Sequence, residues 1–568
     1  MWYRLLCVCV IIATVHGEYS PRNTRIRSKL VQTRQGPIRG YVPQGQEEDI
    51  YVFYNIPYAT VPTGADKFKA PLPPPTWTNV RHAFNEGIVC PQTMLLPLPW
   101  ERREDCLVAN IHVPITTEPI LPVVVIVHTP AFLGFNSYMK NPNFLVDSKK
   151  VIAVTFNYRM GANGFLCLGT EFAPGNAGLK DQVALLRWVR ENIGSFGGDP
   201  TNVTIVGCSS GVDLLVLSRM TFPLFHKVIS DSQCSLSSSI IESDPLQRAI
   251  ETAKKFGVRN PTNMDELEDF YSTYTSIMNN DIILGLGEFM PCVEKNVGQE
   301  MFLDDAPYNI LRDGIRYQKL PTLYGFSKRE AFRFRDDFSN VINELNETFY
   351  NFLPRDLAFE NDDQRVAIGE EVKKFYFGNE VNSTDALAFV NYLTDVEVYP
   401  ILRAVSLRAS AENDQVYLYE YSFTDANSLD IPDTEVRGAS SCDLFSTAFG
   451  RLGQNPTEER VAMAKTLRDL YVNFITTGNP TPPGTNLSTW LPVNSTDRSP
   501  HYSIGETIHL ADVPRQEMAA FWDRIYHQLN SSLPQGLPVP QPPNPNSAAP
   551  SFRNIWIVST MVALLAFK

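Results

Sequence analysis

Ser209 lies in the stretch Gly207-Cys-Ser-Ser-Gly211, which has the G-x-S-x-G pattern of a serine nucleophile on a sharp strand-to-helix turn. The preceding residues 198–206 read as a loop and a short buried strand. Glycine at both ends lets the backbone turn tightly, so that the serine projects above a parallel sheet with the N–H of Ser210 aimed at the same spot. The pattern is short and recurs by chance, so it predicts acyl transfer only where a base and an acid accompany it.

The sequence around this turn indicates a protein family more specifically than the short G-x-S-x-G pattern does. Residues 176–182 read Asn-Ala-Gly-Leu-Lys-Asp-Gln, residues 185–193 place apolar side chains at helical spacing, and residues 196–200 read Phe-Gly-Gly-Asp-Pro. This run resembles the type-B carboxylesterase and cholinesterase family, and the likeness extends from about residue 31 to residue 529. It implies an α/β-hydrolase fold, in which helices flank a central, mostly parallel, twisted sheet in one large domain over residues 18–530.

The resemblance also implies that a triad acid and then a histidine follow the serine. Glu330 occupies the position of the acid. The histidine segment corresponds to residues 436–450, which contain no histidine, and Ser441 stands where the base belongs. Cys442 replaces the glycine after it. A hydroxyl cannot accept a proton at neutral pH as imidazole does, so the sequence predicts a triad without its base.

A second departure concerns the oxyanion hole, whose donors in the family come from a His-Gly-Gly-Gly-Phe loop. Here a β-branched run over residues 121–127 predicts a buried strand, and the loop after it reads His128-Thr129-Pro130-Ala131-Phe132. Pro130 has no N–H, and Ala131 and Ser210 are the donors that remain at these positions. Losing one donor costs about 10²–10³ in turnover. The family places His128 in the loop, outside the triad.

Cysteine offers an alternative nucleophile, because several cysteines fall in segments that lie near the elbow in the family: Cys208, Cys234, Cys292 and Cys442. No histidine near them is available to activate a thiolate. Small buried cysteines, or one extra disulfide, are the interpretation we favour. With Cys167, Cys90 and Cys106 the mature chain holds seven cysteines, an odd number. No Cys/His spacing indicates a metal site, and no cofactor is expected.

The chain begins with an apolar run that predicts a secretory signal over residues 1–17. In an oxidising compartment disulfides persist, and the resemblance implies one between Cys90 and Cys106, worth roughly 3 kcal/mol in the chain-entropy model. Secretion also makes N-x-S/T sequences glycosylation candidates, and six occur: Asn202, Asn346, Asn382, Asn486, Asn494 and Asn530. The net charge of −13 argues against nucleic acid as a partner.

The C-terminal end differs in composition from the rest. Residues 531–548 are rich in proline and predict an extended stalk. Residues 549–568 end in an apolar tail that suits a GPI signal, with attachment at Asn546 or Ser547 and the protein held at the plasma membrane. A retained transmembrane helix is the alternative, although the apolar run at 555–567 is short for a bilayer.

These observations favour a catalytically inactive or severely impaired carboxylesterase-like glycoprotein at the cell surface. It would act by binding an extracellular protein partner or a small apolar ligand, as cholinesterase-like adhesion proteins of the family bind partners. The alternatives are a working ester hydrolase that uses Ser209 with altered machinery, and a slow scavenger that traps reactive esters or organophosphates. Residues 458–474 have a helical pattern, which leaves a homodimer through C-terminal helices open.

Overall fold

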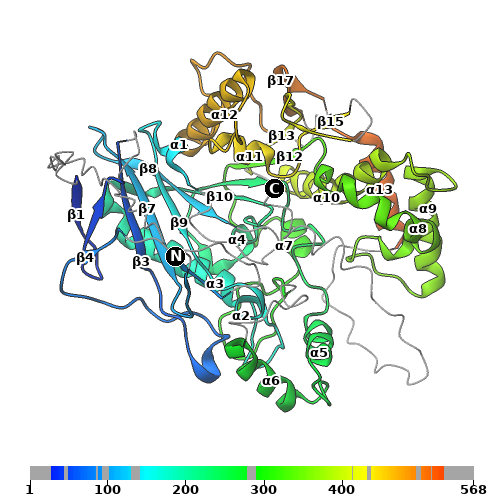
Figure 1. The fold of residues 1–568 in the computed structure, drawn as a ribbon, viewed down its shortest axis with the longest axis horizontal. Coiled ribbons are helices and arrows are strands. Elements are labelled where there is room, and N and C mark those ends of the chain that lie inside the picture. Colours follow the sequence, from blue (N-terminus) through cyan, green and yellow to red (C-terminus); the bar gives the residue numbers. More distant parts are fainter. Residues whose placement is uncertain are drawn as a thin grey trace, which may run out of the picture.

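The structure, a computed structural model, describes residues 27–43, 49–84, 87–91, 101–128, 141–277, 289–411, 414–431, 436–493, 500–512 and 514–529. Within these residues a 13-stranded sheet runs through the molecule with helices on both faces (Figure 1). The strand order is β1-β2-β3-β7-β9-β8-β10-β11-β12-β13-β16-β17, with β4 beside β2. The strands are β1 Ser28–Gln32, β2 Pro37–Tyr41, β3 Ile50–Pro57, β4 Arg81–His82, β7 Val108–Pro114, β8 Leu121–Val127, β9 Ile152–Phe156, β10 Gly198–Cys208, β11 Lys227–Asp231, β12 Thr322–Ser327, β13 Val416–Tyr421, β16 His501–Ile504 and β17 Ile508–Ala511.

The middle of the sheet is parallel from β9 to β16, and antiparallel strands close it at both ends. The predicted mostly parallel sheet in a single domain is therefore confirmed. Parallel strands end at the same edge, and in this fold class that edge holds the functional groups. Ser209 follows β10, Asp231 ends β11 and Glu330 lies three residues beyond β12.

The central strands are buried on both faces, which explains their nearly continuous apolar sequence. In β8, Val123, Val125 and Val127 join the core that contains α3 (Ala177–Asn192). Val124 and Ile126 join the opposite core, which contains α12 (Glu458–Thr477). Each such side chain contributes about 1.5–3 kcal/mol on burial, so the period-two alternation fixes the register of the strand.

Helices connect and cover the strands. The predicted helix over 458–474 is confirmed as part of α12, whose N-cap Thr457 accepts a hydrogen bond from the N–H of Arg460 at 3.1 Å. A group including α8, α9, α10 and α13 lies at one end of the molecule (Figure 1). The remaining α-helices are α1 Asn143–Val146, α2 Gly161–Phe165, α4 Leu214–Leu217, α5 Pro245–Lys255, α6 Met264–Ile277, α7 Pro307–Asp313, α8 Phe338–Glu347, α9 Asp362–Phe377, α10 Ala386–Ala409, α11 Asp443–Ala448 and α13 Gln516–Gln528.

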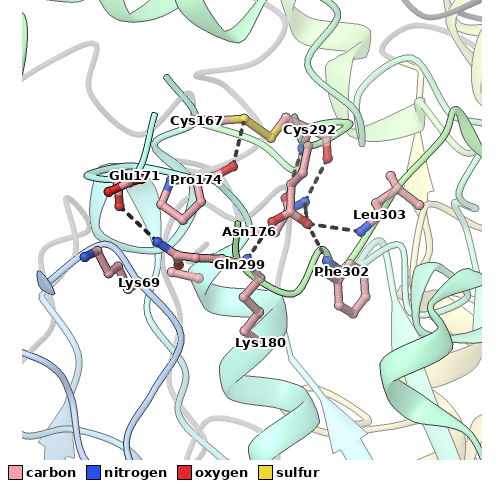
Figure 2. A network of polar contacts seen from close by, with 12 residues as sticks. Lys69, Cys167, Glu171, Pro174, Asn176, Lys180, Cys292, Gln299, Phe302 and Leu303 are labelled. Carbon is pink, nitrogen blue, oxygen red and sulfur yellow. Dashed lines mark hydrogen bonds and ion pairs between the residues drawn. A yellow bond between two sulfur atoms is a disulfide. The ribbon is translucent and has the colours of Figure 1, made fainter. Parts of the chain in front are cut away.

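A buried polar network ties the start of α3 to a distant loop (Figure 2). Lys180 Nζ lies 2.5 Å from Glu294 Oε1, and both side chains are 1% exposed. The other carboxylate oxygen of Glu294 accepts hydrogen bonds from Asn176 Nδ2 and from the N–H groups of Phe302 and Leu303. Each buried charge is therefore paired and hydrogen-bonded, the arrangement that burial of an ion requires.

The described residues all fall inside the predicted domain. The predicted signal at 1–17, stalk at 531–548, C-terminal signal at 549–568 and attachment at Asn546 or Ser547 lie outside them. In the part of the chain that the structure describes, no helix has both the length and the apolar character that a bilayer crossing needs.

Candidate active site

The turn after β10 has the geometry of a nucleophile elbow. Ser209 has a φ of 48°, in the left-handed region that a non-glycine residue seldom adopts, and its N–H donates to the carbonyl of Asp231 at 2.9 Å. A Cβ on Gly207 would lie 2.1 Å from Ser210 Oγ, so this position admits only glycine without a shift. Backbone strain of this kind at a buried serine is typical of a functional turn.

The hydroxyl of Ser209 lies beside another hydroxyl, that of Ser441. Ser209 Oγ lies 3.1 Å from Ser441 Oγ, and the N–H of Ser441 donates to the carbonyl of Glu330 at 3.1 Å. Ser441 belongs to the turn before α11 and is partly exposed. Among the described residues, no histidine hydrogen-bonds to Ser209. The structure thus brings together the three residues that the sequence analysis singled out.

Glu330 is buried behind Ser441. Its Oε1 accepts a hydrogen bond from the N–H of Ser327 at 2.5 Å. Burial, and then the nearby charge of Asp231, raise the pKa of Glu330 to about 8, against the opposing effect of this hydrogen bond and of the hydroxyls of Ser232 and Ser441. At neutral pH Glu330 is therefore mostly protonated.

Asp231, which the sequence analysis did not single out, is a second buried carboxyl of the site. It accepts hydrogen bonds from Ser232 Oγ at 3.1 Å and from the N–H of Phe445 at 3.3 Å. Burial raises its pKa to about 6. The available signal was an acid at the end of a buried strand, Val228-Ile-Ser-Asp231, next to the elbow strand. The charge of Asp231 also contributes to the raised pKa of Glu330, so the two carboxyls interact.

A disulfide bond links the two segments that form the site. Cys208, directly before Ser209, is bonded to Cys442, directly after Ser441, across a sequence separation of 234. The N–H of Cys442 donates to Ser232 Oγ at 3.0 Å. The two segments that carry the facing hydroxyls are thus joined covalently as well as by hydrogen bonds.

The expectation of buried cysteines or one extra disulfide needs correction. Cys90 and Cys106 are bonded as predicted, but there are two further disulfides, Cys208–Cys442 and Cys167–Cys292. Of the cysteines in the described residues, only Cys234 is free; it is buried, and burial raises the pKa of its thiol well above the usual value. None of the four suggested cysteines therefore has a ready thiolate, which excludes the cysteine nucleophile.

The oxyanion donors are described only in part. Ser210 is buried beside the elbow, as expected, whereas Thr129, Pro130 and Ala131 lie outside the described residues. His128 at the end of β8 is 2% exposed and stacks on Tyr158 at 5.1 Å between ring centroids. Its carbonyl accepts a hydrogen bond from the Tyr158 hydroxyl at 2.7 Å. These contacts place His128 in the core packing, in keeping with the interpretation from sequence.

The candidate glycosylation sites differ in accessibility. Asn382 and Asn486 are exposed. Asn202 and Asn346 are half-buried, and the Asn346 side chain both donates to the carbonyl and accepts from the N–H of Val381 at 2.9 Å. Asn494 and Asn530 lie outside the described residues. Exposure therefore favours Asn382 and Asn486 as the sites that an attached glycan would perturb least.

A serine elbow at the carboxyl edge of a mostly parallel sheet, with an acid beyond β12, defines an α/β hydrolase by its fold. Comparison with known proteins is more specific. Residues 27–522 match the model of the carboxylesterase family, and the chain belongs to that family.

Individual relatives support this assignment. The chain is 30% identical over 512 residues to a juvenile hormone esterase of Heliothis virescens, covering 84% of this chain and 90% of that protein. It is 31% identical over 481 residues to a carboxylic ester hydrolase of Bombus ignitus, covering 79% and 85%. The crystal structure of juvenile hormone esterase from Manduca sexta, with OTFP covalently attached, matches with a TM-score of 0.77 at 28% identity. That match covers 88% of this chain and all of the other.

Proposed function

We propose that this carboxylesterase-family protein is severely impaired as an esterase and acts by binding a protein partner or a small apolar ligand outside the cell. One observation carries the proposal: Ser209 Oγ lies 3.1 Å from the hydroxyl of Ser441, the residue that the family resemblance aligns with the general base. Loss of one triad member costs on the order of 10⁴–10⁶ in turnover. The relatives named above are esterases, so the impairment distinguishes this chain within its family.

Two further features support the proposal. The disulfide Cys208–Cys442 joins the residue before Ser209 to the residue after Ser441. It therefore holds the two segments together although no histidine connects them among the described residues. Burial and the charge of Asp231 raise the pKa of Glu330 to about 8, the state expected of an acid position that has no imidazolium beside it to stabilise.

The remaining features support a location outside the cell. Three disulfides occur in the described residues, and such bonds persist in oxidising compartments. The predicted signal, the glycosylation sequences and the GPI-type tail agree with a cell-surface protein. A lipid anchor would present the esterase-fold domain to partners in the extracellular space, as a stalk-mounted binding domain requires.

The test is hydrolysis of p-nitrophenyl butyrate at pH 7 by the purified secreted protein, beside Ser209→Ala. We expect kcat/KM to lie on the order of 10⁴-fold or more below that of an active relative assayed in parallel. Turnover within about tenfold of that relative, abolished by Ser209→Ala, would show a working ester hydrolase instead. A thermal shift series with alkyl acetates of increasing chain length then tests the apolar-ligand half of the proposal. Binding to the folded state raises Tm, and the rise grows with the logarithm of ligand concentration above Kd.

A further inference from the structure

The protein contains a cavity of about 520 Å³ that is separate from the elbow. Residues of the segment 61–67 and of the helices α2 and α6 line it, and these two helices lie close together in Figure 1. Neither Ser209 nor Ser441 is among the described residues that line the cavity. Sites for small molecules occupy roughly 300–1,000 Å³. The cavity is therefore large enough for a ligand that does not touch the elbow.

Three carboxylates line this cavity, those of Glu104, Glu268 and Asp269. Glu268 Oε1 accepts a hydrogen bond from the Thr170 hydroxyl at 2.7 Å. Glu104 and Asp269 are exposed, and among the described residues neither carboxylate has a hydrogen-bond or ion-pair partner. These two acids are therefore available to a positively charged ligand.

The cationic side chains of the cavity already bond to the protein. Lys67 Nζ donates to the carbonyl of Ser272 at 2.5 Å and lies 4.9 Å from the centre of the Phe68 ring. Arg159 is 2% exposed and forms an ion pair with Asp181 at 2.6 Å, so its charge is balanced. Lys67 alone then stands against three carboxylates. Because like charges repel and opposite charges attract, the lining favours a cation over an anion.

Arg159 still offers one hydrogen-bond donor. A guanidinium carries five N–H groups, two of them on each Nη. Nε and Nη2 donate to Asp181, Nη2 also donates to the carbonyl of Lys69, and Nη1 donates to the carbonyl of Lys67 at 2.8 Å. The second N–H of Nη1 has no partner among the described residues. Since a buried donor without a partner is costly, a ligand oxygen in the cavity would be stabilised there.

We propose that this cavity binds a small organic amine in its protonated form, with an apolar body and a neutral oxygen at its other end. The ammonium would lie near Glu104 and Asp269, and the body would contact Val61 and Phe172, which also line the cavity. A neutral oxygen suits Arg159 better than a carboxylate does, because Asp181 already balances the guanidinium. The inference goes beyond the proposed function, since it holds whatever the rate of ester hydrolysis at Ser209.

The experiment is isothermal titration calorimetry of the purified secreted protein at pH 7 with tyramine, a protonated amine that carries a phenolic oxygen. We expect one site per chain with a Kd below about 1 mM. Tyrosol, which replaces the ammonium by a hydroxyl, should bind about tenfold more weakly, because it loses the attraction of two acids. Phenethylamine, which lacks the phenolic oxygen, should bind about fivefold more weakly, the usual worth of one hydrogen bond.

Variants locate the binding in this cavity. Glu104→Gln and Asp269→Asn should each weaken tyramine binding about threefold, and together about tenfold. Asp265→Asn, at an exposed acid of α6 that does not line the cavity, is the matched control and should change Kd little. Ala65→Trp, at an exposed position of the lining, fills the cavity without changing its charge and should weaken binding at least about tenfold.

Several results would overturn the proposal. They are no saturable binding of tyramine up to about 10 mM, tyrosol or phenethylamine binding as tightly as tyramine, the double variant behaving like Asp265→Asn, and Ala65→Trp binding like wild type. Circular dichroism and Tm of each variant establish that it is folded. The ester-hydrolysis assay at Ser209 is a separate measurement, so failure here and failure of the proposed function are distinguishable.

Discussion

Two buried polar clusters in this protein differ in how their charges are balanced. In the first, Lys180 and Glu294 form an ion pair whose remaining carboxylate oxygen is satisfied by three donors (Figure 2). In the second, Glu330 and Asp231 lie together, and among the described residues no lysine or arginine is within ion-pair distance of either. The first cluster ties α3 to a loop and uses matched charges. The second, beside the elbow, keeps two acids that burial makes reluctant to ionise.

The difference indicates which cluster supports the fold and which belongs to the functional site. A buried ion pair holds both partners in their charged forms, because neutralising one partner would leave the other as an unpaired buried charge. Such a pair is therefore unsuited to proton transfer. Acids with raised pKa values next to a strained serine are what a functional site retains. We therefore interpret the Lys180 network as a support of the fold and the Glu330 cluster as the remnant of a triad.

The largest expected effect comes from breaking the matched pair. Glu294→Gln leaves Lys180 as an unpaired buried cation and should lower the free energy of unfolding by about 3–5 kcal/mol. Urea denaturation followed by circular dichroism measures this loss. Glu300→Gln, at an exposed acid 3.9 Å from Arg187, is the control and should change little. Equal effects for the two variants would contradict the assignment of the first cluster to fold support.

Removing the covalent link of the second cluster should have the next largest effect. The double variant Cys208→Ala, Cys442→Ala opens a loop with a sequence separation of 234 and should lower the free energy of unfolding by about 3–5 kcal/mol. The matched control, Cys90→Ala with Cys106→Ala, opens a separation of only 16 and should cost less in the chain-entropy model. The reverse order, measured by the same denaturation, would show that the site disulfide does not constrain the fold.

The unmatched acids predict a dependence of stability on pH. Since the folded-state pKa of Glu330 is raised from 4.5 to about 8, the folded state binds the proton more tightly than the unfolded state. This contribution to stability is fully present below about pH 4.5 and is lost as the pH rises to about 8, by up to about 1.4 kcal/mol per unit. In Glu330→Gln this contribution should be absent, so stability should fall less steeply between pH 6 and pH 8 than in wild type. Wild type and variant with parallel stability profiles from pH 5 to pH 8 would rule out the raised pKa.

The smallest effect concerns the glycans. Asn382→Gln and Asn486→Gln at exposed positions should each remove one glycan and leave Tm within about 1 °C, because surface substitutions rarely exceed 0.5 kcal/mol. Asn346→Gln should lower Tm even without glycans, since the Asn346 side chain bonds twice to Val381. Electrophoretic mobility and Tm of the secreted variants measure both. A stable Asn346→Gln variant would show that this contact is dispensable.

Much of the fold and of the site followed from local sequence. The elbow, the β-branched strand at 121–127 and the helix within α12 depend on patterns of neighbouring residues, and Glu330 and Ser441 followed from the family resemblance. The Cys208–Cys442 pairing could not be predicted, because residues so far apart in sequence meet only through the sheet order. Asp231 was missed for a related reason. An acid at the end of a strand gains meaning only when a neighbouring strand places a second acid beside it.

The central claim is that Ser441 replaces the base at Ser209, and restoring that base tests it most directly. The measurement is kcat/KM for p-nitrophenyl butyrate at pH 7 in Ser441→His, alone and with Pro130→Gly, against the similar-sized but non-basic Ser441→Asn. We predict that Ser441→His gains about 10²-fold or more over wild type, that Pro130→Gly adds to the gain, and that Ser441→Asn gains nothing. A Ser441→His variant no more active than Ser441→Asn, in a folded protein with its three disulfides intact, would contradict the claim.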